Sequence, residues 1–185
     1  MKWLNVPAEE AARRLLGCEL VSTIDGQEVR VRIVETEAYD QLDPASHAFS
    51  GRSARNNAMF ESAGHLYVYL SYGLNFCCNI VCGPDGFGSG VLIRAVEPLS
   101  GLSVIESRRG QTGVRVTNGP GKVCQALGIS LNMSGHDLSH KPVQLIQKPA
   151  LAAEQIVAGK RIGISKNAHA LRRFYEKNNS YISKK

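Results

Sequence analysis

An alternating run over residues 28–37 constrains the fold of this chain more than any other stretch. From residue 29 to residue 33, valine and isoleucine alternate with arginine. A period of two is the pattern of a β-strand that buries one face. Asp25-Gly26, a strong hairpin-turn signal, precedes the run, so residues 19–24 and 28–37 are predicted to form two antiparallel strands.

The end of this predicted strand is acidic. Glu35, Glu37 and Tyr39 stand at alternate positions, so a regular strand places them on the same side. Burying two carboxylates costs free energy unless they find partners. The strand alone leaves two interpretations open: a solvated strand end, or a pair of carboxylates kept for a chemical purpose.

Length and charge narrow the class of protein. The 185 residues suit one domain, residues 1–185, with a sizeable core. Hydrophobic residues make up 43% of the chain, which argues against a disordered protein. Lys and Arg number 22 against 16 Asp and Glu, giving a formal net charge of +6. This surplus fits a polyanionic partner, but the charge is mostly scattered and also fits a merely basic soluble protein.

The cysteines indicate a reducing compartment. There are five, an odd number, and no paired Cys-x-x-Cys motif, so we expect reduced thiols in the core and no metal site. Cys77 and Cys78 are adjacent and are predicted to point to opposite faces of a strand. No apolar run reaches membrane-spanning length, so we expect a cytoplasmic protein without a membrane partner.

A second predicted hairpin carries an aromatic tip. Residues 66–71 and 74–81 are expected to be strands joined by a tight turn at Tyr72-Gly73. Tyr67 and Tyr69 would share one face of the first strand. At the tip, Tyr72 either packs on a neighbouring loop or serves as a wedge that enters a base stack.

Several polar residues stand where they need a partner. Asn79 lies in an apolar strand, so its amide requires an internal partner or a ligand. Arg94 lies between apolar residues and requires a carboxylate or a phosphate. His47 lies in the polar loop 40–57, where an ordinary exposed histidine is the simpler interpretation. Lys122 follows Gly119-Pro-Gly at a predicted helix start, whose free amides are able to hold a phosphate.

The remaining elements follow from periodicity and from Gly and Pro signals. Helices are predicted over residues 7–16, 102–109, 119–127 and 150–157, further strands over 91–96, 143–146, 161–164 and 171–175, and a weakly ordered tail over 177–185.

Several motifs in one order resemble a known family. The first motifs, in chain order, are residues 32–39 (Arg-Ile-Val-Glu-Thr-Glu-Ala-Tyr), His47, Arg55-Asn56, Met59-Phe60, and residues 66–69 (Leu-Tyr-Val-Tyr) with the following Tyr-Gly. Together they are similar to the alkyladenine (3-methyladenine) DNA glycosylase family. Later segments that match are residues 91–99, 119–127, 161–164 and 171–175. The resemblance covers nearly the whole chain, from about residue 11 to residue 183.

The resemblance implies a DNA repair enzyme. Such enzymes flip alkylated or deaminated purines out of the duplex and hydrolyse the N-glycosidic bond with an activated water, leaving an abasic site. By resemblance, Glu37 is the general base, and Arg94 helps to hold the water and a nearby phosphate. The implied base pocket contains Tyr39, His47, Tyr69 and Asn79. The expected DNA contacts are Tyr72, Gly73, Leu74, Arg52, Arg55, Arg109 and Lys122.

The resemblance also implies the fold and the partner. We expect an α+β single domain with a curved, mainly antiparallel and open-barrel-like sheet and peripheral helices. The expected partner is double-stranded DNA that contains damaged purines, bound by a monomer without metal or cofactor and associated with the nucleoid if the source is bacterial. Two rivals remain: a nucleic-acid-binding module without chemistry, and a hydrolase of free nucleosides. Glu37 beside Arg94 argues against the first, and an exposed Tyr72 argues against the second.

Overall fold

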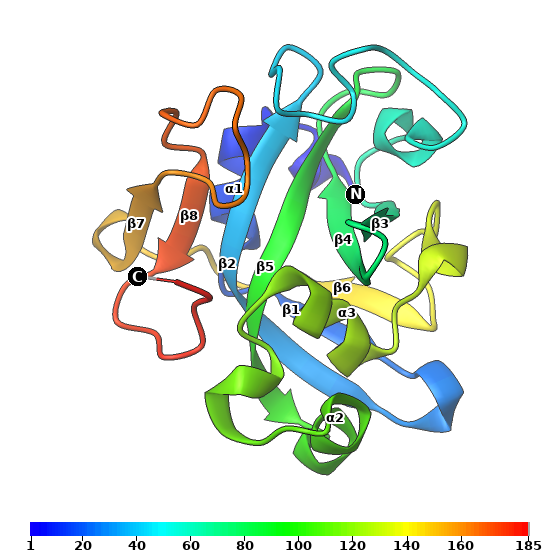
Figure 1. Ribbon diagram of the computed structural model, residues 1–185, viewed down its shortest axis with the longest axis vertical. Coiled ribbons are helices and arrows are strands. Elements are labelled where there is room, and N and C mark those ends of the chain that lie inside the picture. The colour runs from blue at the N-terminus through cyan, green and yellow to red at the C-terminus, as the bar shows by residue number, and fades with distance from the viewer. Residues whose placement is uncertain (185) are drawn as a thin grey trace.

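One antiparallel sheet organises the structure, a computed structural model that describes residues 1–184 (Figure 1). The strands run in the order β3-β4-β5-β2-β1-β6, and β8 pairs with both β2 and β7. The sheet is open, and with its helices it forms the predicted α+β fold. The strands are β1 (Glu19–Ser22), β2 (Val29–Asp40), β3 (Leu66–Ser71), β4 (Asn75–Val81), β5 (Ser89–Ser100), β6 (Val143–Ile146), β7 (Ile156–Gly159) and β8 (Arg173–Glu176).

Short helices cover the sheet where its apolar faces need burial. α1 (Ala8–Leu15) packs against β2 and β5, α3 (Pro120–Leu127) packs against β4 and β5, and α2 (Leu102–Arg109) lies against α3. These three confirm the predicted helices over 7–16, 119–127 and 102–109. Single turns of 3₁₀ helix occur at Lys2–Leu4, Ile24–Gly26, Asn57–Phe60, Gly113–Val116, Leu131–Met133 and Ala153–Gln155.

The long strand β2 is the centre of the sheet, as Figure 1 shows. Along one edge it pairs with β5, and along the other it pairs first with β1 and then with β8. Val29, Val31 and Ile33 are fully buried in the main core, which confirms the predicted apolar face. The strand continues to Asp40, three residues beyond the predicted end, because β5 keeps pairing with it as far as Ser89.

The predicted helix over residues 150–157 is wrong. Residues 153–155 form only a 3₁₀ turn, and residues 156–159 form the strand β7. β-branched Ile156 and Val157 suit a strand, and β7 pairs with β8 in register Ile156↔Glu176. These local preferences and the pairing with a strand that lies later in the chain therefore both favour β7 over a helix.

Two further predictions near the end of the chain are also wrong. Residues 161–164 form no strand, because the Ile162 amide donates to the Glu37 side chain, 2.8 Å away, and joins no ladder. The weakly ordered tail predicted over residues 177–185 is wrong for residues 177–184, since Ser183 makes two hydrogen bonds to Glu35, and residue 185 lies outside the described residues. The predicted last strand, 171–175, is correct in place but runs from Arg173 to Glu176.

Over residues 1–184, the helices are all too short or too polar to cross a membrane. The five cysteines are buried, as predicted for small core residues. Cys78 belongs to the main core while Cys77 faces a cavity on the other side of β4, as their adjacency predicted.

Candidate active site

A cavity of about 680 Å³ opens where β2, β3, β4 and β5 meet residues 162–166. This space, called here the central cavity, is of the size that holds a small ligand or a base. Its walls include the side chains that the sequence predicted for catalysis and base binding, namely Glu37, Arg94, Tyr39, His47, Tyr69 and Asn79. The tertiary structure thus brings together residues that are spread over four strands and a loop.

Glu37 is fully buried at the inner end of this cavity. Its Oε1 accepts the Ile162 amide at 2.8 Å, and its Oε2 accepts the Tyr39 hydroxyl at 2.7 Å. Arg94 Nη1 lies 3.3 Å from Oε1. Burial raises the pKa of Glu37 above its usual range, while the Arg94 charge and the two hydrogen bonds limit the rise. The carboxylate is therefore strongly fixed in position but not strongly acidic.

Arg94 reaches Glu37 because β5 has an irregularity at this residue. Glu35 pairs with Ala95 and Thr36 pairs with Ile93, so Arg94 is an extra residue opposite β2. Such a β-bulge re-aims a side chain out of the regular ladder. Arg94 consequently lies between the two carboxylates, with Nε 3.4 Å from Glu35 and Nη1 3.3 Å from Glu37.

Glu35 is fully buried as well, so the solvated strand end is the wrong interpretation of this acidic stretch. Its Oε1 accepts hydrogen bonds from Arg173 at 2.9 Å and from the Ser183 hydroxyl at 2.9 Å. Its Oε2 accepts the Ser183 amide at 2.6 Å. The sequence placed Glu35 beside Glu37 but gave no sign of these partners, which lie about 140 residues later in the chain.

Aromatic rings form one wall of the central cavity. Tyr67 and Tyr69 are stacked with centroids 5.6 Å apart, which confirms that they share a face. His47 meets Tyr69 edge-on at 4.5 Å, and its Nδ1 lies 2.9 Å from the Tyr67 hydroxyl. Burial and the nearby Arg55 charge lower the pKa of His47, which favours the neutral ring. Tyr67, which the sequence did not assign to the site, therefore orients the histidine that it did assign.

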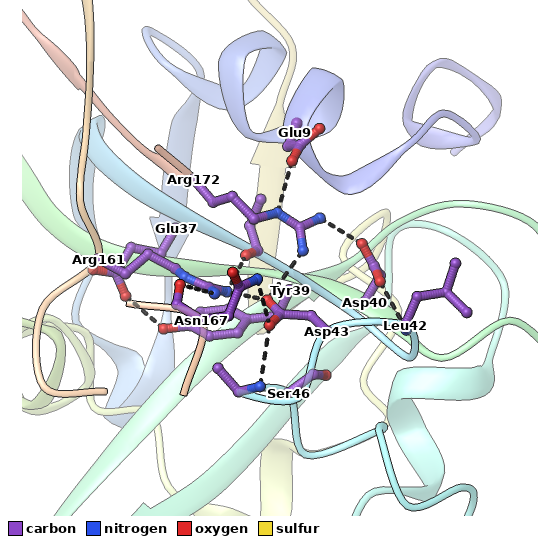
Figure 2. A network of polar contacts seen from close by, with 12 residues as sticks. Glu9, Glu37, Tyr39, Asp40, Leu42, Asp43, Ser46, Arg161, Asn167 and Arg172 are labelled. Atoms are coloured by element: carbon purple, nitrogen blue, oxygen red, sulfur yellow. Dashed lines mark hydrogen bonds and ion pairs between the residues drawn. The ribbon is translucent and has the colours of Figure 1, made fainter. Parts of the chain in front are cut away.

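Tyr39 is held from behind by an arginine. The Arg161 guanidinium lies 4.6 Å from the centre of the Tyr39 ring. Figure 2 shows Arg161 in a network with Asp43, Asn167 and Arg172, which joins the loop after β2 to residues 161–172. The same segment presents the Ile162 amide to Glu37. The network thus fixes both hydrogen-bond donors of Glu37.

The centre of the network is removed from solvent. Arg161 and Asp43 form an ion pair between two fully buried side chains, and Arg172 adds a second contact to Asp43 at 3.0 Å. Arg172 also contacts Asp40 and, at 2.7 Å, Glu9 of α1 (Figure 2). Burial raises the pKa of Asp43, but hydrogen bonds from Arg161, Ala45 and Asn167 outweigh that effect and bring the pKa below its usual range.

Asn79 closes the inner side of the cavity. Its Nδ2 donates to the Tyr67 carbonyl at 3.2 Å across the β3–β4 ladder, and the residue is buried. The amide therefore has the internal partner that an apolar strand demands, while the side chain still lines the cavity.

The tip of the β3–β4 hairpin is exposed. Tyr72 and Gly73 have φ values of 50° and 70°, and the Leu74 amide donates to the Ser71 carbonyl at 3.0 Å. Two positive φ angles are the mark of the turn that suits a two-residue hairpin. Tyr72 is 87% exposed and Leu74 is 80% exposed, so the tip presents an unusual amount of apolar surface. The Tyr72 hydroxyl lies 3.4 Å from the Gly163 carbonyl, at the rim of the central cavity.

The predicted cationic DNA contacts are not all brought to the cavity. Arg55 lines it, whereas Arg52, Arg109 and Lys122 do not. Arg52 donates to the Asn57 side chain at 2.7 Å, and Lys122 donates to Asn118 at 2.7 Å. Arg109 donates to the Val116 carbonyl at 3.0 Å. Arg109, Arg115 and Lys122 form one basic cluster beside the start of α3. Burial and the charges of the two arginines lower the pKa of Lys122.

The sequence missed the wall formed by residues 162–166. All five line the cavity, and Ile162 contributes a backbone donor that no side-chain pattern reveals. Gly163, with a φ of 78°, is the available signal, because glycine tolerates that conformation and so argues against a strand. The described residues 1–184 contain no group of three or more His, Cys, Asp or Glu side chains placed to hold a metal ion.

Comparison with known proteins gives one consistent result. The model of the family described as methylpurine-DNA glycosylase matches residues 2–180. Three similar proteins carry the name "Putative 3-methyladenine DNA glycosylase". The protein from Carboxydothermus hydrogenoformans is 46% identical over 94% of this chain and 92% of its own length. Those from Nitrosospira multiformis and Methanoculleus marisnigri are 51% and 44% identical, over 85% and 94% of this chain and 79% and 92% of their own lengths. The chain belongs to the methylpurine-DNA glycosylase family.

Proposed function

We propose that this protein hydrolyses the N-glycosidic bond of alkylated or deaminated purines in double-stranded DNA and leaves an abasic site. The observation that carries the proposal is the buried Glu37 carboxylate, fixed beside Arg94 in a cavity with aromatic walls. A protein that only binds DNA has no need of a buried carboxylate facing its ligand, because that group repels an anionic partner and is costly to bury.

Glu37 is proposed to be the general base. A base must be ionised to accept a proton, and the Arg94 charge favours the ionised carboxylate against the effect of burial. Oε1 and Oε2 each accept one hydrogen bond from the protein, so a water molecule in the cavity would still find a free lone pair. Glu37 would take a proton from this water as the water oxygen attacks C1′ of the flipped nucleotide and the purine leaves.

The aromatic wall is proposed to bind the purine. A purine alkylated at N3 or N7 is cationic, and stacking against Tyr39 or Tyr69 favours a cation. Such a base is also an activated leaving group, so one carboxylate and one water suffice. A neutral lesion such as hypoxanthine needs a hydrogen bond as well, which His47 is placed to make at the cavity wall.

The hairpin tip is proposed to fill the gap in the duplex. A flipped nucleotide costs a few kcal/mol of lost pairing and stacking, which an inserted side chain compensates in part. Tyr72 is an exposed apolar side chain that lines the cavity, and Leu74 is exposed beside it on the same turn. Arg55 and the cluster of Arg109 and Lys122 would contact phosphates of the same duplex, to which the protein binds as a monomer.

Single-turnover excision tests the proposal. Duplex oligonucleotides that carry 7-methylguanine, hypoxanthine or ethenoadenine are mixed with excess wild-type protein, Glu37→Gln or Glu97→Gln. We expect wild type to excise at least one lesion and Glu37→Gln to lose about 10²–10⁴-fold in rate with lesion binding retained. Glu97→Gln is the matched control, since Glu97 pairs with Arg32 on the same sheet and does not line the cavity.

Each alternative predicts a different result. Lesion binding without excision by the wild type would support a binding module without chemistry. Release of base from free nucleosides, with no preference for DNA, would support a nucleoside hydrolase. Full activity of Glu37→Gln would overturn the assignment of the base.

A further inference from the structure

Glu35 is the buried carboxylate of the site to which the proposed reaction gives no role. It is as fully buried as Glu37 and lies on the same side of β2. Arg173, from β8, donates to it at 2.9 Å, and Ser183 donates to it through both its amide and its hydroxyl. Arg173 also binds the Lys184 carbonyl at 2.9 Å. Glu35 thus joins β2, β8 and residues 183–184 around one carboxylate.

Arg94 depends on this group for its position. Its contacts to the two carboxylates, at 3.4 Å and 3.3 Å, are ion pairs rather than well-formed hydrogen bonds. Its Nε is buried, and among residues 1–184 it has no hydrogen-bond partner. Its hydrogen bond within the described chain runs from Nη2 to the Ser183 hydroxyl at 3.4 Å. Because that hydroxyl donates its own proton to Glu35, Ser183 relays the anchoring of Glu35 to Arg94.

We propose that Glu35 is a positioning residue for the reaction: held by Arg173 and Ser183, it fixes the Arg94 guanidinium between the two carboxylates and divides its charge between them. This inference rests on the proposed function of Glu37 as the base. The bulge at Arg94 supplies the geometry, since the extra residue on β5 lets one guanidinium face both Glu35 and Glu37. Glu35 and Glu37 carry two negative charges, and Arg94 and Arg173 carry two positive ones, so this buried group is electrically neutral.

The balance has a consequence for the pH dependence. Removing the charge of Glu35 leaves Glu37 with two arginines and without a repelling neighbour, so the pKa of Glu37 should fall. A lower pKa keeps the base ionised at lower pH, and the acid limb of the rate profile should follow it. The charged or titratable groups that face Glu37 from the surrounding elements are Glu35 and Tyr39 of β2, Tyr69 of β3, Arg94 of β5, Arg173 of β8, and Arg161 behind Tyr39.

The first test compares pH profiles of single-turnover excision for wild type, Glu35→Gln and Glu97→Gln. We expect Glu35→Gln to move the acid limb to lower pH by about one unit, because Arg94 then acts on Glu37 alone. The plateau rate should fall several-fold, because a carboxylate of lower pKa is a weaker base. Glu97→Gln removes a carboxylate that pairs with Arg32 away from the cavity and should leave the limb in place. A purely structural role for Glu35 would reduce the fraction of active protein without moving the limb, and an unmoved limb overturns the proposal.

A second variant tests the relay without removing a charge. Ser183→Ala keeps the hydrogen bond from its backbone amide to Glu35 and loses only the hydroxyl. We therefore expect a several-fold lower plateau rate, with recovery in Ser183→Thr. If Glu35→Gln fails to fold, the two Ser183 variants test the proposal. An unchanged rate in Ser183→Ala overturns it, and a loss that threonine restores supports it.

Failure of the proposed function can be told apart from failure of this inference. The pKa of the Glu37 carboxyl can be read directly by carbon-13 NMR, with its resonance assigned by its disappearance in Glu37→Gln. If the wild type excises no lesion, the proposed function fails, but the titration of Glu37 still tests the effect of Glu35 on its pKa. A lower Glu37 pKa in Glu35→Gln supports the division of charge, and an equal pKa overturns it.

Discussion

Two hydrogen-bond donors hold the Glu37 carboxylate, one close to it in the sequence and one far from it. Tyr39 stands two residues along the same strand, and its hydroxyl meets Oε2 at 2.7 Å. Ile162 comes from a segment 125 residues away and meets Oε1 through its amide. The first contact follows from the alternation of β2, so its side was predictable. The second depends on how the chain returns to the sheet, and no side-chain pattern encodes a backbone donor.

Replacing Tyr39 by phenylalanine should move the pH dependence in the direction opposite to that of Glu35→Gln. The hydroxyl stabilises the ionised form of Glu37, so its loss raises the pKa of the carboxyl further above its usual range. The base is then protonated over a wider range, and the acid limb of excision moves to higher pH. Rates at pH 6 should fall by more than rates at pH 8, as measured by single-turnover excision. Equal losses at both pH values would contradict this account.

At the scale of elements, the β3–β4 hairpin separates residues that pack into the fold from the residues that are proposed to enter the duplex. Its strands contribute Tyr67, Tyr69 and Asn79 to the cavity, while its tip contributes side chains that hardly pack on the protein. The turn itself was predictable, because Tyr-Gly between two apolar runs indicates a two-residue hairpin. The approach of Tyr72 to Gly163 was not, since it depends on the later segment.

Tyr72→Ala should impair excision from duplex DNA far more than it changes stability. The side chain is 87% exposed, so the free energy of unfolding should change by less than about 0.5 kcal/mol. Excision from a duplex should fall at least about tenfold because the gap is no longer filled, whereas excision from single-stranded DNA should change little. Tyr72→Phe is the matched control, because it keeps the ring and loses only the contact to Gly163. Equal losses on both substrates would argue against a wedge.

At the scale of the whole molecule, the buried network around Asp43 ties together parts of the chain that are far apart in sequence. It connects α1 through Glu9, the end of β2 through Asp40, and residues 161–172 through two arginines (Figure 2). Breaking a buried ion pair costs more than forming it gains, because the remaining charge stays buried without its partner. The network should therefore contribute to global stability as well as to the site.

Asp43→Asn should lower the free energy of unfolding by about 3–5 kcal/mol, measured by urea denaturation. The pKa of Asp43 lies below its usual range, so its carboxylate stabilises the native state above the unfolded-state pKa, and that contribution disappears as the pH falls through the native pKa. The difference between wild type and Asp43→Asn should therefore narrow on acidification. Glu10→Gln is the control, since Glu10 and Arg14 form an exposed pair one helical turn apart worth about 0.5 kcal/mol or less.

The sequence alone determined the elements whose signals are local. The alternation of β2, the turn at Tyr72-Gly73 and the helix bounds of α2 depend on neighbouring residues, and each was predicted. The predicted helix over 150–157 and strand over 161–164 were wrong, because β7 and the Ile162 amide take their partners from other parts of the chain. Local propensity is a weak guide wherever such a partner decides.

The candidate site divides along the same line. The sequence brought forward Glu37, Tyr39 and Arg94, because charged side chains in apolar strands require partners, and the family resemblance added Tyr69. Only the tertiary structure showed the bulge that aims Arg94 at two carboxylates, and the roles of Arg173 and Ser183 around Glu35. The physical reason is that alternation determines which face a side chain occupies, whereas register, bulges and returning segments determine what it meets there.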